Sequence, residues 1–165
     1  MRTLARLLVG IGLCAAIACS PHGRRPGTWL SGELTTRPAA GWSFTSEIPE
    51  IFVETRSGFG VPHSVTTVCA SHAGALYVPS VYFEGGEFPD HRRWNRNVAR
   101  DPRVRVGIAG KLYEGRAELV TDPAERAGVL GAFAAKYPFW QQMLDQPEAE
   151  RPTLVLLRID PRRES

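Results

Sequence analysis

The chain has 165 residues, of which 43% are hydrophobic and 22% charged, with a formal net charge of +3 at pH 7. This length indicates one domain, and the composition is typical of a soluble globular protein. Removal of Arg2 and Arg6 with the leader described below lowers the net charge to +1. A nearly neutral domain lacks the basic footprint of a nucleic-acid-binding protein, so nucleic acid is excluded as a partner.

An export signal is predicted at the N-terminus. Arg2 and Arg6 precede an uncharged apolar run at 7–17, and small residues precede Cys19. This order is typical of a secretory signal peptide, and the run is shorter than the roughly 20 apolar residues that cross a bilayer. The small residues before Cys19 resemble the bacterial lipobox, which implies cleavage after residues 1–18 and lipidation of Cys19. An uncleaved apolar helix is the alternative.

These features predict an exported lipoprotein, anchored in the cell envelope by its N-terminal lipid on the expected periplasmic face. Residues 19–28 contain several Pro and Gly residues and are expected to form a tether, and 29–165 the folded domain. Cys69 is then the one thiol left over, so no intramolecular disulfide is expected. Because Cys69 lies in an apolar stretch, we expect it to fill space in the core; a reactive thiol is the alternative.

The folded domain alternates short strand-like and helix-like segments. A first short strand is a candidate at 29–34. Segments rich in β-branched, aromatic or alternating apolar residues predict six further strands; they are 51–55, 64–70, 76–83, 104–109, 112–120 and 153–159. About six short strands in so small a chain predict a mainly β fold with short helices and a closed barrel, because closure removes exposed strand edges.

Two helices interrupt the strands. A polar helix is expected at 91–100, and a second one opens at Asp122. Asp122 is a suitable N-cap, Pro123 suits the first helical position, and Glu125 completes a capping box. A short further helix is expected near 140–144.

Several motifs follow one another in an order that resembles a known family. The most specific block holds basic residues and Trp94 ahead of Asn97, followed by Asp101-Pro102 and Val104. Over 51–136 the pattern resembles the flavin-binding split barrel of the pyridoxamine-phosphate-oxidase type, which includes nitroreductases and deazaflavin-dependent relatives. This resemblance implies a six-stranded antiparallel split β-barrel of the FMN-binding type. It also implies a homodimer with FMN or a deazaflavin bound at the subunit interface.

The same resemblance implies which residues bind the cofactor. In the family, polar residues of a strand and basic residues at a helix start hold the phosphate, while a strand end flanks the ring. The corresponding residues here are Ser64, Thr66, Thr67, Val78, Ser80, Arg92, Arg93, Trp94 and Asn97. The physics agrees, because a helix start offers free N–H groups and Arg adds charge-assisted bonds to phosphate.

The function implied is that of an oxidoreductase acting on a small-molecule electron acceptor. Because the cofactor carries the hydride chemistry, no side chain is predicted as catalytic. The alternative is a cofactor-free binding or scaffolding lipoprotein, since Glu84 and Glu87 lie beside the expected phosphate site. The arginines of 91–100 then form only a solvated helix face. The histidines show no metal-ligand spacing, so no metal site is predicted.

Overall fold

The computed structural model describes residues 27–35, 41–83 and 85–161. The expected signal peptide, Cys19 and the tether up to residue 26 lie outside the described residues. Within the described ranges, no helix is both long and apolar enough to cross a bilayer.

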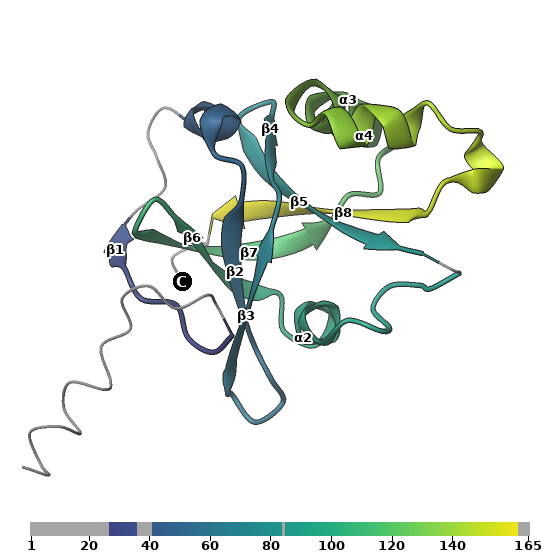
Figure 1. Ribbon diagram of the computed structural model, residues 1–165. Coiled ribbons are helices and arrows are strands. Elements are labelled where there is room, and N and C mark those ends of the chain that lie inside the picture. The colour runs from purple at the N-terminus through teal and green to yellow at the C-terminus, as the bar shows by residue number, and fades with distance from the viewer. Residues whose placement is uncertain (1–26, 36–40, 84, 162–165) are drawn as a thin grey trace, which may run out of the picture.

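One curled sheet forms the body of the domain (Figure 1). Its strands are β1 (Glu33–Thr35), β2 (Ile51–Arg56), β3 (Pro62–Thr67), β4 (Ala70–His72), β5 (Ala75–Tyr82), β6 (Arg103–Ile108), β7 (Lys111–Leu119) and β8 (Thr153–Pro161). The hydrogen-bonded order is β3-β2-β6-β7-β8-β5-β4, antiparallel throughout, and β1 pairs with β7 in parallel. The predicted mainly β split barrel is confirmed, with eight strands in the sheet instead of six.

The two additional strands have physical reasons. The predicted strand at 64–70 is divided, because β3 ends at Thr67 and, after only two residues, the chain continues in β4, which is the other edge strand of the curled sheet. The first strand covers only Glu33–Thr35. In the segment before it, the backbone N–H of Leu30 donates to the Glu54 carboxylate at 2.6 Å. This N–H is therefore bonded to a side chain and not to the backbone of a neighbouring strand.

The inner face of the curled sheet surrounds the first hydrophobic core. Val53, Val106 and Tyr113 lie opposite one another in the register of β2, β6 and β7, and all three are buried. The helix α2 (Arg93–Arg100) adds Trp94 and Val98 to this core. Cys69 is fully buried in the same cluster, which confirms its predicted place in the core.

A second core lies on the outer face of β5 and β8, under two helices (Figure 1). These are α3 (Pro123–Lys136) and α4 (Pro138–Leu144); short 3-10 turns occupy Ser43–Glu47 and Glu148–Glu150. Phe133 of α3 is fully buried and stacks on Trp140 of α4 with 4.6 Å between ring centroids. Burial of apolar surface on both faces of β5 and β8 therefore holds this half of the sheet.

The predicted start of α3 is confirmed. The Asp122 carboxylate accepts the N–H of Glu125 at 2.7 Å, and Pro123 occupies the first turn. The other half of the predicted capping box is not formed, because the Glu125 carboxylate accepts from Tyr77 Oη at 2.8 Å and from Arg158 Nη1 at 2.9 Å. A contact with the sheet has replaced the local one, and it ties α3 to β5 and β8.

Stability at high pH should depend on Tyr77. Its burial, followed by its hydrogen bond to Glu125, raises the pKa of Tyr77 to about 12, from about 10 in the unfolded chain. A raised folded-state pKa stabilises the fold fully below pH 10, and this contribution is lost as pH rises towards 12. We expect the difference in unfolding free energy between wild type and Tyr77→Phe to shrink between pH 9 and 12, measured by urea denaturation. A difference that is constant with pH contradicts the raised pKa of Tyr77.

Gly115 of β7 lies where the strand β8 approaches closely. A Cβ at this position would lie 2.7 Å from the Asp160 carbonyl oxygen and 2.9 Å from Ile159 Cγ2. We expect Gly115→Ala to lower the unfolding free energy by about 1–3 kcal/mol through overpacking. The matched control is Gly131→Ala on α3, where nothing lies within 4 Å of the added Cβ; it should raise stability by about 0.5–1 kcal/mol. Equal effects in urea denaturation contradict the close approach of β7 and β8.

Candidate functional site

The start of α2 carries the basic residues expected to meet a phosphate. His91 has a φ of 60° and Arg92 is extended, so the helix begins at Arg93, two residues later than predicted. No side chain caps this helix start, and its first turn contains no acid. The first N–H groups therefore have no capping side chain among the described residues.

Arg92 and Arg93 differ in what they contact. The Arg92 guanidinium donates to the Val81 carbonyl at 2.8 Å and lies 5.9 Å from the centroid of the Tyr82 ring. It is therefore held against the end of β5. Arg93 is exposed and forms no ion pair within the part of the chain that the structure describes. Its positive charge is free to meet an anion.

The strand β3 lies close to this helix start. Burial, together with the nearby Arg93 charge, lowers the pKa of His63, which places Arg93 beside the first half of β3. The next residue, Ser64, is buried, and its Oγ has no hydrogen-bond partner among the residues that the structure describes. Thr66 is exposed, whereas the Thr67 hydroxyl donates to the Val68 carbonyl at 3.4 Å. The Thr66 side chain is thus open to solvent, whereas the Ser64 hydroxyl is unpaired but enclosed.

Four of the predicted site residues are packed inside the chain. Val78 and Trp94 belong to the first core. Ser80 Oγ accepts from Asn95 Nδ2 at 2.7 Å, and Asn97 Nδ2 donates to Thr55 Oγ1 at 2.9 Å. These contacts fix α2 against β5 and β2. Cofactor contact by all nine predicted residues stays a prediction, and these four have a positioning role in the fold.

Asn95 was not among the predicted residues. It is fully buried, its Nδ2 also bonds the Tyr82 hydroxyl, and its Oδ1 has no partner within the described part of the chain. The one hint in the sequence was its position directly after Trp94, which lies in the core together with Val98. Only the packing shows that this amide points inwards.

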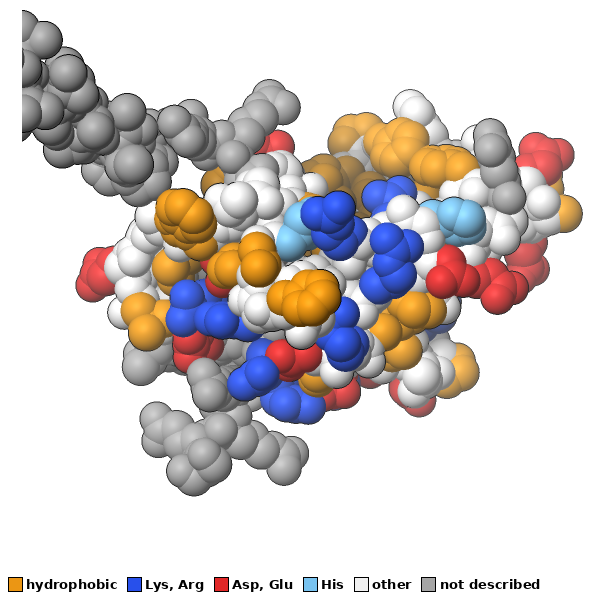
Figure 2. Space-filling model, turned by 90° about the horizontal axis from the view of Figure 1, so that it is seen from below, with side chains coloured by type: hydrophobic (Ala, Val, Ile, Leu, Met, Phe, Trp, Pro, Cys, Tyr) orange, Lys and Arg blue, Asp and Glu red, His pale blue; other side chains and the backbone are white. Residues whose placement is uncertain are grey.

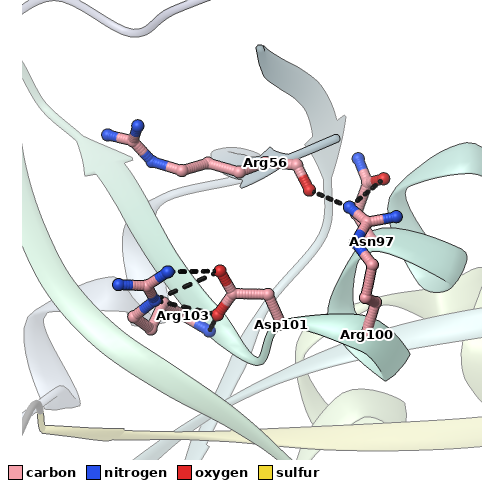
Figure 3. A network of polar contacts seen from close by, with 5 residues as sticks. All are labelled: Arg56, Asn97, Arg100, Asp101 and Arg103. Atoms are coloured by element: carbon pink, nitrogen blue, oxygen red, sulfur yellow. Dashed lines mark hydrogen bonds and ion pairs between the residues drawn. The ribbon is translucent and has the colours of Figure 1, made fainter. Parts of the chain in front are cut away.

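Arg100 and Asp101 close α2 against the neighbouring strands (Figure 3). Arg100 Nη2 donates to the Arg56 carbonyl and, at 3.2 Å, to Asn97 Oδ1. Asp101 holds Arg103 through two carboxylate oxygens, with a closest distance of 2.7 Å, and these bonds lower the pKa of Asp101. The end of α2 is therefore a structural clamp, whereas its start is open.

Two open hollows lie on the outer face of β2, β6, β7 and β8, with volumes of about 1070 and 310 Å³. Neither is lined by a predicted cofactor residue. Most of their arginines are paired with acids, as Arg103 is with Asp101 and Arg158 is with Asp160; Arg56, at the smaller hollow, is the exception. A cation that already has an acidic partner offers less to a phosphate, so we place the candidate site at the start of α2.

Solved structures share this fold. A conserved hypothetical protein from Mycobacterium tuberculosis superposes with a TM-score of 0.52 and 21% identity, over 78% of this chain and 87% of that one. The haem storage protein HutZ from Vibrio cholerae superposes with a TM-score of 0.55 and 16% identity, over 73% of this chain and 87% of that one. A structure described as a domain-swapped dimer superposes with a TM-score of 0.52 and 19% identity, over 68% of this chain and 81% of that one. These likenesses show the split-barrel fold, and the comparison with curated proteins gave no match.

The sequence also matches a family profile over most of the domain. The profile covers residues 48–157, which include β2, β3, the whole of α2 and the strands that support it. The predicted resemblance to the split-barrel oxidoreductases and their deazaflavin-dependent relatives is thereby confirmed. The chain belongs to the F420H(2)-dependent quinone reductase family.

Proposed function

We propose that this protein uses the deazaflavin F420 to reduce a small acceptor of the quinone type. The family and the fold place the chain in the superfamily of flavin- and deazaflavin-type oxidoreductases. Of the two cofactors predicted from the sequence, the family favours the deazaflavin over FMN. The quinone acceptor follows from the family's name and is part of the proposal.

The observation that carries the proposal is the open, cationic start of α2. Cations at a helix N-terminus oppose the helix dipole, which favours an anion there. Arg92 and Arg93 occupy this position with no capping side chain and no acid in the first turn. A bound phosphate relieves the unfavourable arrangement and accepts from the free N–H groups.

The residues beside this helix start fit a deazaflavin nucleotide. The buried Ser64 Oγ has no partner, and such an unpaired group is costly unless a ligand or water satisfies it. Arg93 and the free N–H groups at the start of α2 would hold the phosphate, with Arg92 beside it at the end of β5. Ser64 and Thr66 alternate along β3 with the core-facing Val65, so their contact with the cofactor stays a prediction. The chemistry supplied by the cofactor when bound is hydride transfer. Asn95 and Asn97 act as positioning residues, because their bonds to Ser80 and Thr55 set where α2 begins.

We also propose a homodimer. The outer face of β2, β6 and β7 is not covered by any of the described helices, which pack inside the curl or on β5 and β8. The charged pairs on this face, such as Arg105 with Glu114 at 3.1 Å, form within one chain. Support for a second copy comes from a solved structure of the same fold that is described as a domain-swapped dimer. Export and lipidation at Cys19 remain proposals from the sequence.

Equilibrium binding tests the proposal directly. We expect F420 to quench protein fluorescence with a Kd at least about tenfold below that of FMN, since each 1.4 kcal/mol of preference gives one decade. Mixing the protein with F420H(2) and menadione should then restore the absorbance of oxidised F420. If neither cofactor binds at high micromolar concentration, the proposal fails and the cofactor-free binding module gains support.

A further inference from the structure

The hairpin between β2 and β3 ends in a well-ordered apolar tip. Phe59 is 98% exposed and Val61 is 57% exposed. The tip is not a loose loop, because Ser57 N donates to the Val61 carbonyl at 2.9 Å and Gly60 N donates to the Ser57 carbonyl at 2.9 Å. Val61 N also donates to Ser57 Oγ at 3.1 Å. These bonds hold two apolar side chains in solvent, an arrangement that the fold of one chain does not need.

Arginines surround the base of this tip. Arg100 Nη2 bonds the Arg56 carbonyl, and a Cβ on Gly58 would lie 3.7 Å from Arg100 Nη1, so the end of α2 lies against the hairpin. Arg56 and Arg96 are exposed and form no ion pair among the described residues. Neither the hairpin, 56–67, nor α2 contains an acid. From this side, apolar side chains project between blue Lys and Arg side chains (Figure 2).

We propose that this tip and its arginines dock on an anionic lipid bilayer, with Phe59 and Val61 in the interfacial layer. Aromatic side chains favour that layer, and arginines beside it bind anionic headgroups. A protein partner requires a complementary patch of roughly 800 Å² on each side, which a narrow projecting tip does not supply. An anionic bilayer fits all three features of the tip: its convex shape, its exposed aromatic group and its unpaired positive charge.

This docking goes beyond the proposed function and does not rest on it. It follows from the hairpin and α2 alone, whether or not a cofactor binds. Its consequence is orientation: the end of α2 contacts the hairpin, and the start of this short helix lies about 10 Å further along it, so the candidate site is on the part of the molecule that carries the docking tip. An apolar acceptor dissolved in the bilayer then has a short path to that site.

Photocrosslinking tests which face meets the lipid. The full chain, with Cys19→Ser to remove the expected acylation site, carries p-benzoylphenylalanine in place of either Phe59 or Phe139. Phe139 on α4 is the matched control. It is also an exposed phenylalanine, at 59%, and lies with α3 and α4 on the outer face of β5 and β8. Vesicles contain phosphatidylcholine with or without phosphatidylglycerol, and no F420 is added. The ratio between the two positions reports orientation even if the N-terminal apolar segment itself binds vesicles.

With anionic vesicles, we expect at least about five times more lipid adduct at position 59 than at position 139. Arg56→Ala combined with Arg96→Ala should lower the adduct at 59 by on the order of 20-fold, since each basic residue near such a surface contributes about fivefold. Far-UV circular dichroism confirms that each variant is folded. Any of three results overturns the proposal. They are equal adduct yields at positions 59 and 139, a yield at position 59 that is the same with and without phosphatidylglycerol, and crosslinks from position 59 to a second copy of the chain.

Discussion

Replacing Arg93 with glutamate should weaken F420 binding by roughly a hundredfold while leaving the fold intact. Loss of a charge-assisted hydrogen bond, followed by repulsion, amounts to about 3 kcal/mol. The same change places an acid at the start of α2, which the helix dipole favours by about 0.3–1 kcal/mol. Binding and stability are therefore expected to move in opposite directions, which a general loss of structure does not produce.

The control for this prediction is Arg96→Glu. Arg96 is exposed on the same helix but lies one turn beyond its start. We expect its F420 affinity to fall by less than about tenfold, because Arg96 would act on the phosphate only through solvent-exposed charge and makes no charge-assisted hydrogen bond to it. Fluorescence titration gives the affinities and urea denaturation gives the stabilities. Equal losses in the two variants would mean that α2 acts only through its general positive charge.

Replacing Phe133 with alanine should remove much of the stability of the domain. Phe133 is fully buried in the second core and stacks on both Trp140 and Tyr137. Truncation of such a side chain costs about 3–5 kcal/mol, because the transfer of apolar surface is lost and a cavity remains. For a domain of this size, we expect the Tm to fall by roughly 10 °C.

Phe139→Ala is the matched control for the second core. Phe139 lies on α4, one residue before Trp140, but is exposed. Its truncation should change the unfolding free energy by no more than about 0.5 kcal/mol. Urea midpoints of both variants compare the two sites directly. A Phe133→Ala loss as small as that of Phe139→Ala contradicts the packing of α3 and α4 on the sheet.

Local patterns in the sequence predicted the elements whose causes are local. The α3 helix begins where Asp122 and Pro123 placed it, because an N-cap bond spans only three residues. The strand at Lys111–Leu119 follows from alternation, with Tyr113 and Ala117 buried and Arg116 exposed. Both signals depend on neighbours along the chain, and a sequence shows those neighbours directly.

Features set by distant partners could not be predicted in this way. The Glu125 carboxylate matches a capping box, yet it bonds Tyr77 and Arg158, which are 48 and 33 residues away. Asn95 lies in a polar run, and only the packing of α2 against β5 directs its amide to Ser80. A buried donor takes the best available acceptor in space, and sequence distance does not enter that choice.

The sequence by itself determined the β-rich split-barrel class, the short basic helix and the family, because each depends on periodicity or on an ordered motif. The tertiary structure decided how the nine expected cofactor residues divide. Arg93 and Thr66 are exposed, Ser64 has an unpaired but enclosed hydroxyl, and Arg92 and Thr67 donate to backbone carbonyls. The other four, Val78, Ser80, Trp94 and Asn97, are engaged in packing and internal hydrogen bonds. The reason is that burial and hydrogen-bond partners are properties of the folded chain, which decides which side chains remain available to a ligand.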